Sequence, residues 1–291
     1  MIIIDNNLIT SPKIDKIILS FPKSLHNMRM IQYFIDDYDI NTIKINHSSY
    51  HVSGYLFLID NKVQGKLSYS NKDNRIYLTF NPSKLKPYQL NLIKYLLHNI
   101  EDKRFYNIDI AIDCYIDIVN ADINNHKVHK KSITYNKKNI ETIAFGTKTS
   151  GKRVIFYDKK AESPKEYAEI PLIHRVEIRL YSSKANNLIN TDFSSLLNGY
   201  QIKKLKINDS VELKGKSLTT TQKLQIKEYI NRKYGIPFTA KEEYKIKYLI
   251  KKLNKTDYKP LFDEILKQSE STIKEQLQGF ISDIVEYKGV A

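Results

Sequence analysis

The chain has 291 residues, which fits one large domain or two ordinary ones, and it carries 47 Lys and Arg against 32 Asp and Glu, a formal net charge of +15. Such an excess favours a polyanionic partner, and nucleic acid is preferred to a membrane because no apolar run approaches the roughly 20 residues that span a bilayer. The single cysteine, Cys114, excludes an intramolecular disulfide and a cysteine metal cluster.

The N-terminal part alternates between apolar and polar residues in the manner of a sheet protein, with two helical interruptions. Amphipathic helices are predicted at 24–38, with Ser24 as the N-cap, and at 86–100, with Pro87 in the first turn. Strands are predicted around and between them, at 16–21, 51–60, 62–70 and 75–81.

The middle of the chain is again extended, and the end is helical. Further strands are predicted at 106–118, 131–136, 141–147, 152–160, 173–181 and 200–207. After about residue 217 the period becomes that of a helix, and helices are predicted at 219–235, 242–255 and 259–288.

These elements predict an α+β fold of largely antiparallel sheets packed with helices, which forms a domain over residues 1–212. A second region, helical and basic, is predicted over residues 213–291. The boundary is placed there because the pattern changes near residues 210–218 and Lys far outnumbers acid between about 200 and 260.

Four predicted strands have one aliphatic and one polar face, since side chains alternate along a strand. The polar faces hold Asp109 and Asp113 in one strand, Arg153, Tyr157 and Lys159 in a second, Arg175, Glu177 and Arg179 in a third, and Arg75, Tyr77 and Thr79 in a fourth. One interpretation is a sheet with one wet face, and alternation alone does not show that the strands are neighbours. Two aspartates inside one strand are unfavourable, however, which points to a functional use.

The acidic residues predict a site for a hard divalent ion, Mg²⁺ or Mn²⁺. Residues four apart on a regular strand lie roughly 13 Å from each other, so Asp109 and Asp113 do not both bind one ion directly unless a bulge intervenes. One aspartate together with Glu177 from a neighbouring strand is the more economical ligand set. Which of Asp109 and Asp113 binds the ion stays open.

Four segments, in this order, resemble the replication initiators of rolling-circle plasmids of the Rep_trans type. They are FNPSKL (80–85), IDIAID (108–113), ETIAFGTKTSGKRVIFYDKKAE (141–162) and HRVEIRL (174–180). The resemblance implies that Tyr157 is the nucleophile, and that Asp109 and Glu177, with Asp113 as a further candidate, bind a divalent metal. Related proteins often have an acid two residues before Asn-Pro, where this chain has Thr79, so a shell of three carboxylates is in question.

The chemistry implied by the resemblance is that of a DNA nickase with topoisomerase-like strand transfer. Tyr157 attacks a phosphodiester and keeps the 5′-phosphate, the released 3′-OH primes synthesis, and the phosphotyrosine conserves the bond energy for rejoining. Lys159 is expected to stabilise the phenolate, and Arg153, Arg175 and Arg179 to hold the phosphate.

The expected partners are origin DNA, both the duplex and the single-stranded nick site, together with a second copy of the chain and a host helicase. The region from about 200 to 260 would bind the duplex through phosphates, and the opening MIII is too short for a signal peptide, so a cytoplasmic protein is expected. Two alternatives remain: a relaxase of a conjugative element, and a DNA-binding repressor without enzymatic activity.

Overall fold

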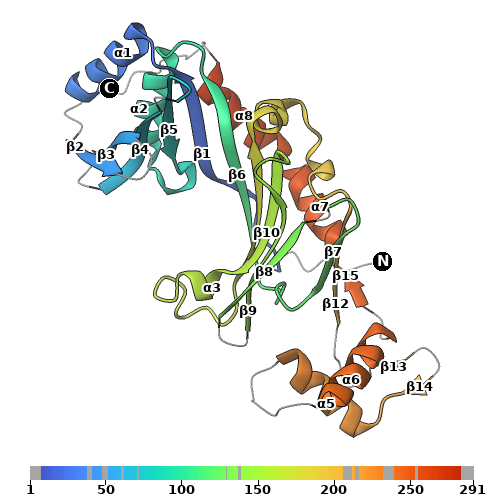
Figure 1. The fold of residues 1–291 in the computed structure, drawn as a ribbon. Coiled ribbons are helices and arrows are strands. Elements are labelled where there is room, and N and C mark those ends of the chain that lie inside the picture. Colours follow the sequence, from blue (N-terminus) through green and yellow to red (C-terminus); the bar gives the residue numbers. More distant parts are fainter. Residues whose placement is uncertain are drawn as a thin grey trace.

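The computed structural model describes residues 8–37, 41–47, 52–59, 62–70, 72–128, 130–136, 139–205, 212–213, 216–231, 239–252 and 255–282. Its centre is a ten-stranded antiparallel sheet with the strand order β2-β3-β4-β5-β1-β6-β11-β10-β9-β8 (Figure 1). The strands are β1 (Lys13–Pro22), β2 (Asn41–His47), β3 (Val52–Ile59), β4 (Lys62–Ser70), β5 (Arg75–Phe80), β6 (Arg104–Cys114), β8 (Lys131–Asn136), β9 (Asn139–Thr147), β10 (Lys152–Asp158) and β11 (His174–Tyr181).

Two smaller sheets complete the strands. One joins β15 (Lys255–Asp257), β12 (Tyr200–Leu205) and β7 (Asp122–Asn125), and the other joins β13 (Glu212–Leu213) and β14 (Lys216–Ser217). The α-helices are α1 (Leu25–Asp37), α2 (Pro87–His98), α3 (Lys159–Glu162), α4 (Ser182–Asn186), α5 (Thr220–Asn231), α6 (Ala240–Lys252), α7 (Lys259–Gln268) and α8 (Glu270–Ile281). Short 3₁₀ helices are η1 (Pro82–Lys84), η2 (Asn187–Asn190) and η3 (Phe193–Ser195). The predicted α+β class is confirmed.

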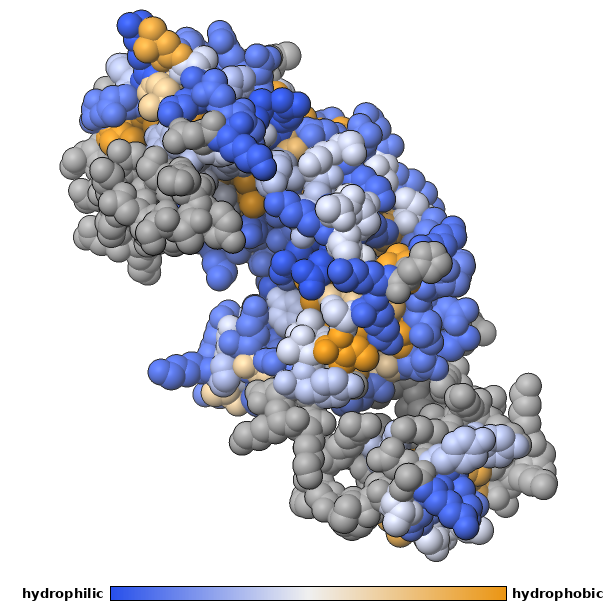
Figure 2. Space-filling view, in the orientation of Figure 1, coloured by the Kyte–Doolittle hydropathy of each residue, from blue (hydrophilic) through white to orange (hydrophobic). Residues whose placement is uncertain are grey.

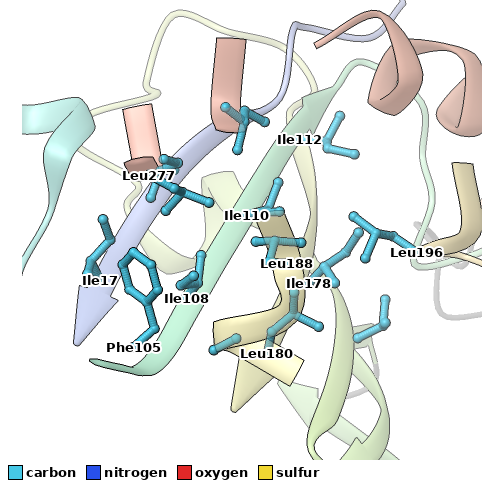
Figure 3. Packing of buried hydrophobic residues seen from close by; sticks show 14 of the residues in the cluster. Ile17, Phe105, Ile108, Ile110, Ile112, Ile178, Leu180, Leu188, Leu196 and Leu277 are labelled. Carbon is cyan, nitrogen blue, oxygen red and sulfur yellow. The ribbon is translucent and has the colours of Figure 1, made fainter. Parts of the chain in front are cut away.

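One face of the sheet is buried beneath helices. The aliphatic residues of the central strands β6 and β11 lie in a single hydrophobic cluster with side chains from α8, η2 and the segment after η3 (Figure 3). Ile108, Ile110 and Ile178 are fully buried there, as is Leu277 of α8. The opposite face therefore receives the polar half of each strand.

Most predicted elements agree with the structure to within a few residues. The strands β2, β7, β13, β14 and β15 and the short helices α3 and α4 were not predicted. β10 ends at Asp158 instead of residue 160, because the Asp158 side chain accepts a hydrogen bond from Ala161 N at 2.9 Å and caps α3. The predicted helix 259–288 is two helices, α7 and α8, which meet at Ser269; residues 283–288 lie outside the described part.

Helices α7 and α8 follow the predicted division at residue 213 and pack on the main sheet. Both helices run alongside the main sheet in Figure 1, and Phe262, Leu266 and Phe280 belong to the same hydrophobic cluster as β6 and β11. By contrast, α5 and α6 pack on each other and lie away from the sheet, with Ile226 and Ile246 buried outside that cluster. The chain thus leaves the core for the α5–α6 hairpin and returns to it. Among the described residues, no helix combines the length and the apolar character needed to cross a bilayer.

Replacing Phe280 tests whether α8 is part of the core. The Phe280 ring is 1% exposed and its centroid lies 5.2 Å from that of Phe80 in β5. We expect Phe280→Ala to lower the free energy of unfolding by about 3–5 kcal/mol in denaturant titrations. Tyr244→Ala, at a position that is 73% exposed on α6, should change it by less than about 0.5 kcal/mol. Similarly small changes in the free energy of unfolding for both variants would favour the predicted division at residue 213.

Candidate active site

Three central strands place the predicted residues in rows on the polar face. β10 pairs with β11, and β11 with β6, in a register without shifts from His174 to Tyr181. The first row is Tyr157–Arg175–Asp113, the second Ile155–Glu177–Ala111 and the third Arg153–Arg179–Asp109. Side chains far apart in the sequence are thereby brought together on one surface.

Tyr157 lies against Glu177 in this arrangement. Its side chain is 8% exposed and packs with Ala144 and Ile155 in a small apolar cluster, and its hydroxyl donates a hydrogen bond to Glu177 Oε2 at 3.2 Å. Burial and the charge of Glu177 raise the pKa of Tyr157 well above its usual value. The phenol is therefore protonated at neutral pH, and the acceptor for its proton is already in contact with it.

Asp109 and Glu177 share one cation. Both carboxylates are buried, Arg179 Nε binds Glu177 Oε1, and it lies 3.7 Å from Asp109 Oδ2. Burial and the neighbouring charge of Glu177 raise the pKa of Asp109 to about 6, although Asn107 and Arg179 oppose the shift. Glu177 thus divides its oxygens, with Oε2 on the tyrosine and Oε1 on the arginine.

The carboxylate oxygens of Asp109 and Glu177 are the kind of ligand that a hard divalent cation prefers. Arg179 offsets one of the two negative charges, so the pair keeps a net negative charge that a divalent cation would offset. Among the residues that the structure describes, no group of three or more His, Cys, Asp or Glu side chains could surround an ion. An ion at this position would have Asp109 and Glu177 as its protein ligands.

Asp113 has different partners. Arg175 binds both of its carboxylate oxygens, at 2.5 Å and 3.0 Å, and Lys13 Nζ lies 3.2 Å from Oδ2. Burial tends to raise the pKa of Asp113, but Arg175 outweighs it and the pKa is lowered. The regular register between Asp109 and Asp113 also leaves no bulge that would bring them together. Asp109 is thus the aspartate of this strand that is placed beside Glu177.

The basic residues predicted to hold the phosphate or stabilise the phenolate differ in burial and in their partners. Arg175 is 3% exposed, and it is committed to Asp113 and, at 3.3 Å, to Asp15, so the expectation that it holds phosphate does not fit. Arg153 lies beside Arg179, and within the described ranges its Nε is buried without a hydrogen-bond partner. Lys159 begins α3 and does not continue the strand face; its ammonium pairs with Glu162 and lies 5.8 Å from the centroid of the Tyr157 ring.

The comparisons with known proteins match this region of the chain. A sequence model of the Rep_trans family, described as a replication initiation factor, matches residues 120–256, slightly less than half of the chain. The predicted resemblance is confirmed. The matched segment includes Tyr157 and Glu177, whereas Asp109 joins them through strand pairing.

A rolling circle replication initiator protein from Geobacillus stearothermophilus is similar in structure, with a TM-score of 0.46 and 17% sequence identity. The similarity covers 69% of this chain and 89% of that one. A comparison with curated proteins gave no match.

Two residues that contact the site, Asn107 and Asp15, were not predicted from the sequence, and both precede the segment that matches the Rep_trans family. Asn107 is buried and its amide donates to Asp109 Oδ1 at 2.8 Å and to Leu180 O at 3.0 Å, which fixes one carboxylate oxygen. Asp15 reaches Arg175 from a register shift between Ile14 and Lys16 of β1. Asn107 follows the alternation of β6 and could have been found, but the shift that places Asp15 has no sequence signal.

Thr79, at the position where an acid is frequent in related proteins, lies two strands from the aspartate strand. It pairs with Ile18 of β1, and Ile18 pairs with Asn107. An acid here would share the face of Asp109 and Asn107. Threonine leaves that position neutral.

The pKa of Asp109 predicts a pH-dependent difference in stability. Because the folded pKa of about 6 exceeds the ordinary value near 4, the unfolded chain loses this proton first, and the wild type loses stability as the pH rises from about 4 to about 6. In metal-free buffer, the free energy of unfolding of Asp109→Asn minus that of wild type should rise by about 2–3 kcal/mol over this window.

Asp113→Asn is the matched control, because the pKa of Asp113 is lowered. Its carboxylate contributes stability above the unfolded pKa and loses it as the pH falls, so the difference between variant and wild type has the opposite slope, below about pH 4. Denaturant titrations across the range measure both. Parallel slopes for the two variants would contradict the assigned environments.

Proposed function

We propose that this chain nicks and rejoins one DNA strand at a replication origin through a 5′-phosphotyrosine on Tyr157, and so initiates rolling-circle replication of a plasmid. The observation that supports it is the cluster of Tyr157, Glu177, Asp109 and Arg179 on one face of the sheet. The family match supports a role in replication initiation, and three residues of this cluster, Tyr157, Glu177 and Arg179, lie inside the matched segment.

The nicking step transfers a phosphoryl group between two oxygens. The Tyr157 oxygen forms a bond to phosphorus while the bond from phosphorus to the 3′-oxygen breaks, which leaves the 5′-phosphate on the tyrosine. The phenolic proton passes to Glu177 Oε2, its hydrogen-bond acceptor, and the departing 3′-oxygen takes a proton from solvent water and leaves as a hydroxyl. Rejoining is the reverse, and needs no nucleotide cofactor because the number of phosphoester bonds is unchanged.

The cationic residues are placed to hold the phosphate. Arg179 is the partly exposed cation of the cluster, and Arg153 lies next to it with a buried nitrogen that lacks a partner among the described residues. A buried donor without an acceptor costs about 1–3 kcal/mol, so a phosphate oxygen at Arg153 would remove a penalty already present. Lys159, near the tyrosine ring, is the third candidate.

Asp109 and Glu177 would hold a Mg²⁺ or Mn²⁺ ion. When bound, such an ion acts as a Lewis acid on the scissile phosphate. Asn107 keeps Asp109 in place by occupying one of its oxygens, and Arg179 is free to turn towards DNA once its negative partners are neutralised.

The partners follow from the same proposal. The basic α5–α6 hairpin stands apart from the core and would bind origin duplex through its phosphates, while the polar sheet face receives the single-stranded nick site. A homodimer and a host helicase are proposed from the Rep_trans resemblance, with the reaction in the cytoplasm. Figure 2 shows a largely hydrophilic surface on the side drawn, apart from the residues in grey.

Replacing the nucleophile tests the proposal. We expect Tyr157→Phe to abolish nicking of supercoiled origin plasmid and formation of a covalent protein–DNA adduct, with DNA binding unchanged, because only the attacking oxygen is lost. Tyr167→Phe is the matched control, since Lys159 Nζ lies 6.0 Å from that ring and 5.8 Å from the Tyr157 ring. Electrophoresis of the plasmid and mass spectrometry of the adduct measure the outcome.

Three outcomes separate the alternatives. Nicking by Tyr157→Phe at the wild-type rate would refute Tyr157 as the nucleophile. Loss of nicking only in Tyr167→Phe would assign the nucleophile to Tyr167. Binding without any adduct from the wild type would favour a DNA-binding repressor. A conjugative relaxase uses the same chemistry at a transfer origin, so activity on that origin alone would favour the relaxase.

The carboxylate pair also predicts metal binding without reference to activity. Mn²⁺ or Mg²⁺ should raise the melting temperature of the wild type, because a ligand that binds the folded state stabilises it. Glu177→Gln and Asp109→Asn should remove most of this rise. Glu162→Gln, whose side chain is 52% exposed and pairs with Lys159, should keep it. An equal rise in all four proteins would place the ion elsewhere.

A further inference from the structure

A bulge in β6 brings a tyrosine to the polar face beyond the active site. The pairing of β1 with β6 shifts by one residue between Ile18–Asn107 and Leu19–Phe105, which leaves Tyr106 without a partner in the register. Strict alternation would bury Tyr106 in the core beneath the helices. The bulge instead turns it outwards, in the way that bulges redirect side chains next to active sites.

Tyr106 meets Tyr77 of β5 there. The two ring centroids lie 5.0 Å apart in an edge-to-face arrangement, and the Tyr77 hydroxyl donates to Asp73. Both rings are half-buried, and neither belongs to the hydrophobic core or to the side chains packed against it. We call Tyr77 and Tyr106 the tyrosine platform.

Cations surround the platform. Lys148 Nζ, from the exposed turn between β9 and β10, lies 4.8 Å from the Tyr106 ring centroid. Arg75 is held by Ser20, its guanidinium donating to Ser20 O at 2.9 Å, and Arg104 is exposed nearby. Asp73 and Asp102 are the acids close to this group, so the cations are in excess. Aromatic rings among cations are the arrangement that binds unpaired bases and their phosphates.

The platform and the active site lie on one continuous face. Asn107, the neighbour of Tyr106, donates to Asp109, and the rows of Arg179 and then Tyr157 follow along the same strands. Tyr106 is seven residues from Asp113, which lies in the row of Tyr157, a separation of roughly 20 Å along a strand. Several nucleotides of an unpaired strand would span that distance, with Arg153 and Arg179 beneath the phosphates between.

We propose that the tyrosine platform binds an unpaired base of the nicked strand, several nucleotides from the scissile phosphate. The base stacks on the rings, and Lys148 moves from the Tyr106 face to the adjoining phosphate. This inference rests on the proposed function, since it assumes that single-stranded DNA reaches Tyr157. The platform itself makes and breaks no covalent bond, so it can be tested apart from nicking. Stacking also accepts any base.

Equilibrium binding of single-stranded DNA tests the platform apart from nicking. All proteins carry Tyr157→Phe, and the probe is a labelled oligothymidylate of about 20 nucleotides read by fluorescence anisotropy. Tyr106→Leu and Tyr77→Leu should each weaken binding roughly 10-fold, as expected for loss of one stacked base. Tyr106→Phe, which keeps the ring, should bind within about twofold of the parent if stacking, not the hydroxyl, is what binds.

Two further variants guard against a folding defect. Lys148→Ala, at an exposed turn, should weaken binding and lower the slope of log affinity against log salt by about 0.7, the value for one phosphate of a single strand. Tyr33→Leu, at a position that is 55% exposed on α1, should bind like the parent. Unchanged affinity in Tyr77→Leu, Tyr106→Leu and Lys148→Ala would overturn the proposal.

Photocrosslinking then places the base. Oligonucleotides with 5-iodouracil at successive positions around the nick site should crosslink to Tyr106 or Tyr77 from one window of positions, and crosslinks confined to other residues would overturn the inference. If Tyr157→Phe still nicks while the platform variants lose affinity, the proposed nucleophile fails and the platform stands. If Tyr157 forms the adduct while those variants bind normally, the platform fails alone.

Discussion

The register of β10, β11 and β6 is the constraint on which the rest of the structure depends. Side chains alternate, so a slip of one residue in either pairing would send Glu177 into the core and an isoleucine into the site. The register is held by the opposite face, where Ile108, Ile110 and Ile178 are fully buried beneath helices. The hydrophobic effect thus positions the polar groups, although none of them takes part in it.

Ion pairing is what allows these polar groups to remain buried. Two ion-paired sets lie side by side, Arg175 with Asp113 and Arg179 with Asp109 and Glu177. They differ in use, because Arg175 is enclosed and bound in two places, whereas Arg179 is partly exposed and faces two competing acids. The first set fixes the geometry, and the second has the raised pKa and the open side that a reacting centre requires.

The sequence predicted which residues share a face and could not predict which faces meet. Alternation placed Tyr157, Asp109 and Glu177 on polar faces, but strand pairing joins residues far apart in the chain and leaves no local pattern. The bulges that present Asp15 and Tyr106 were invisible for the same reason. Helical periodicity predicted helix over α7 and α8 but could not show that their apolar sides cover the sheet.

Glu177 links the two halves of the site, and in the proposed reaction its position would let a tyrosine with a raised pKa act as the nucleophile. A phenolate formed in advance would be buried beside a carboxylate, which is why the pKa rises. With Oε2 accepting from the hydroxyl and Oε1 bound to Arg179, the carboxylate can take the proton as the bond to phosphorus forms, so that no free phenolate is needed. In the proposed reaction, the same burial that keeps Tyr157 protonated at rest would confine its attack to the moment when a phosphate lies against it.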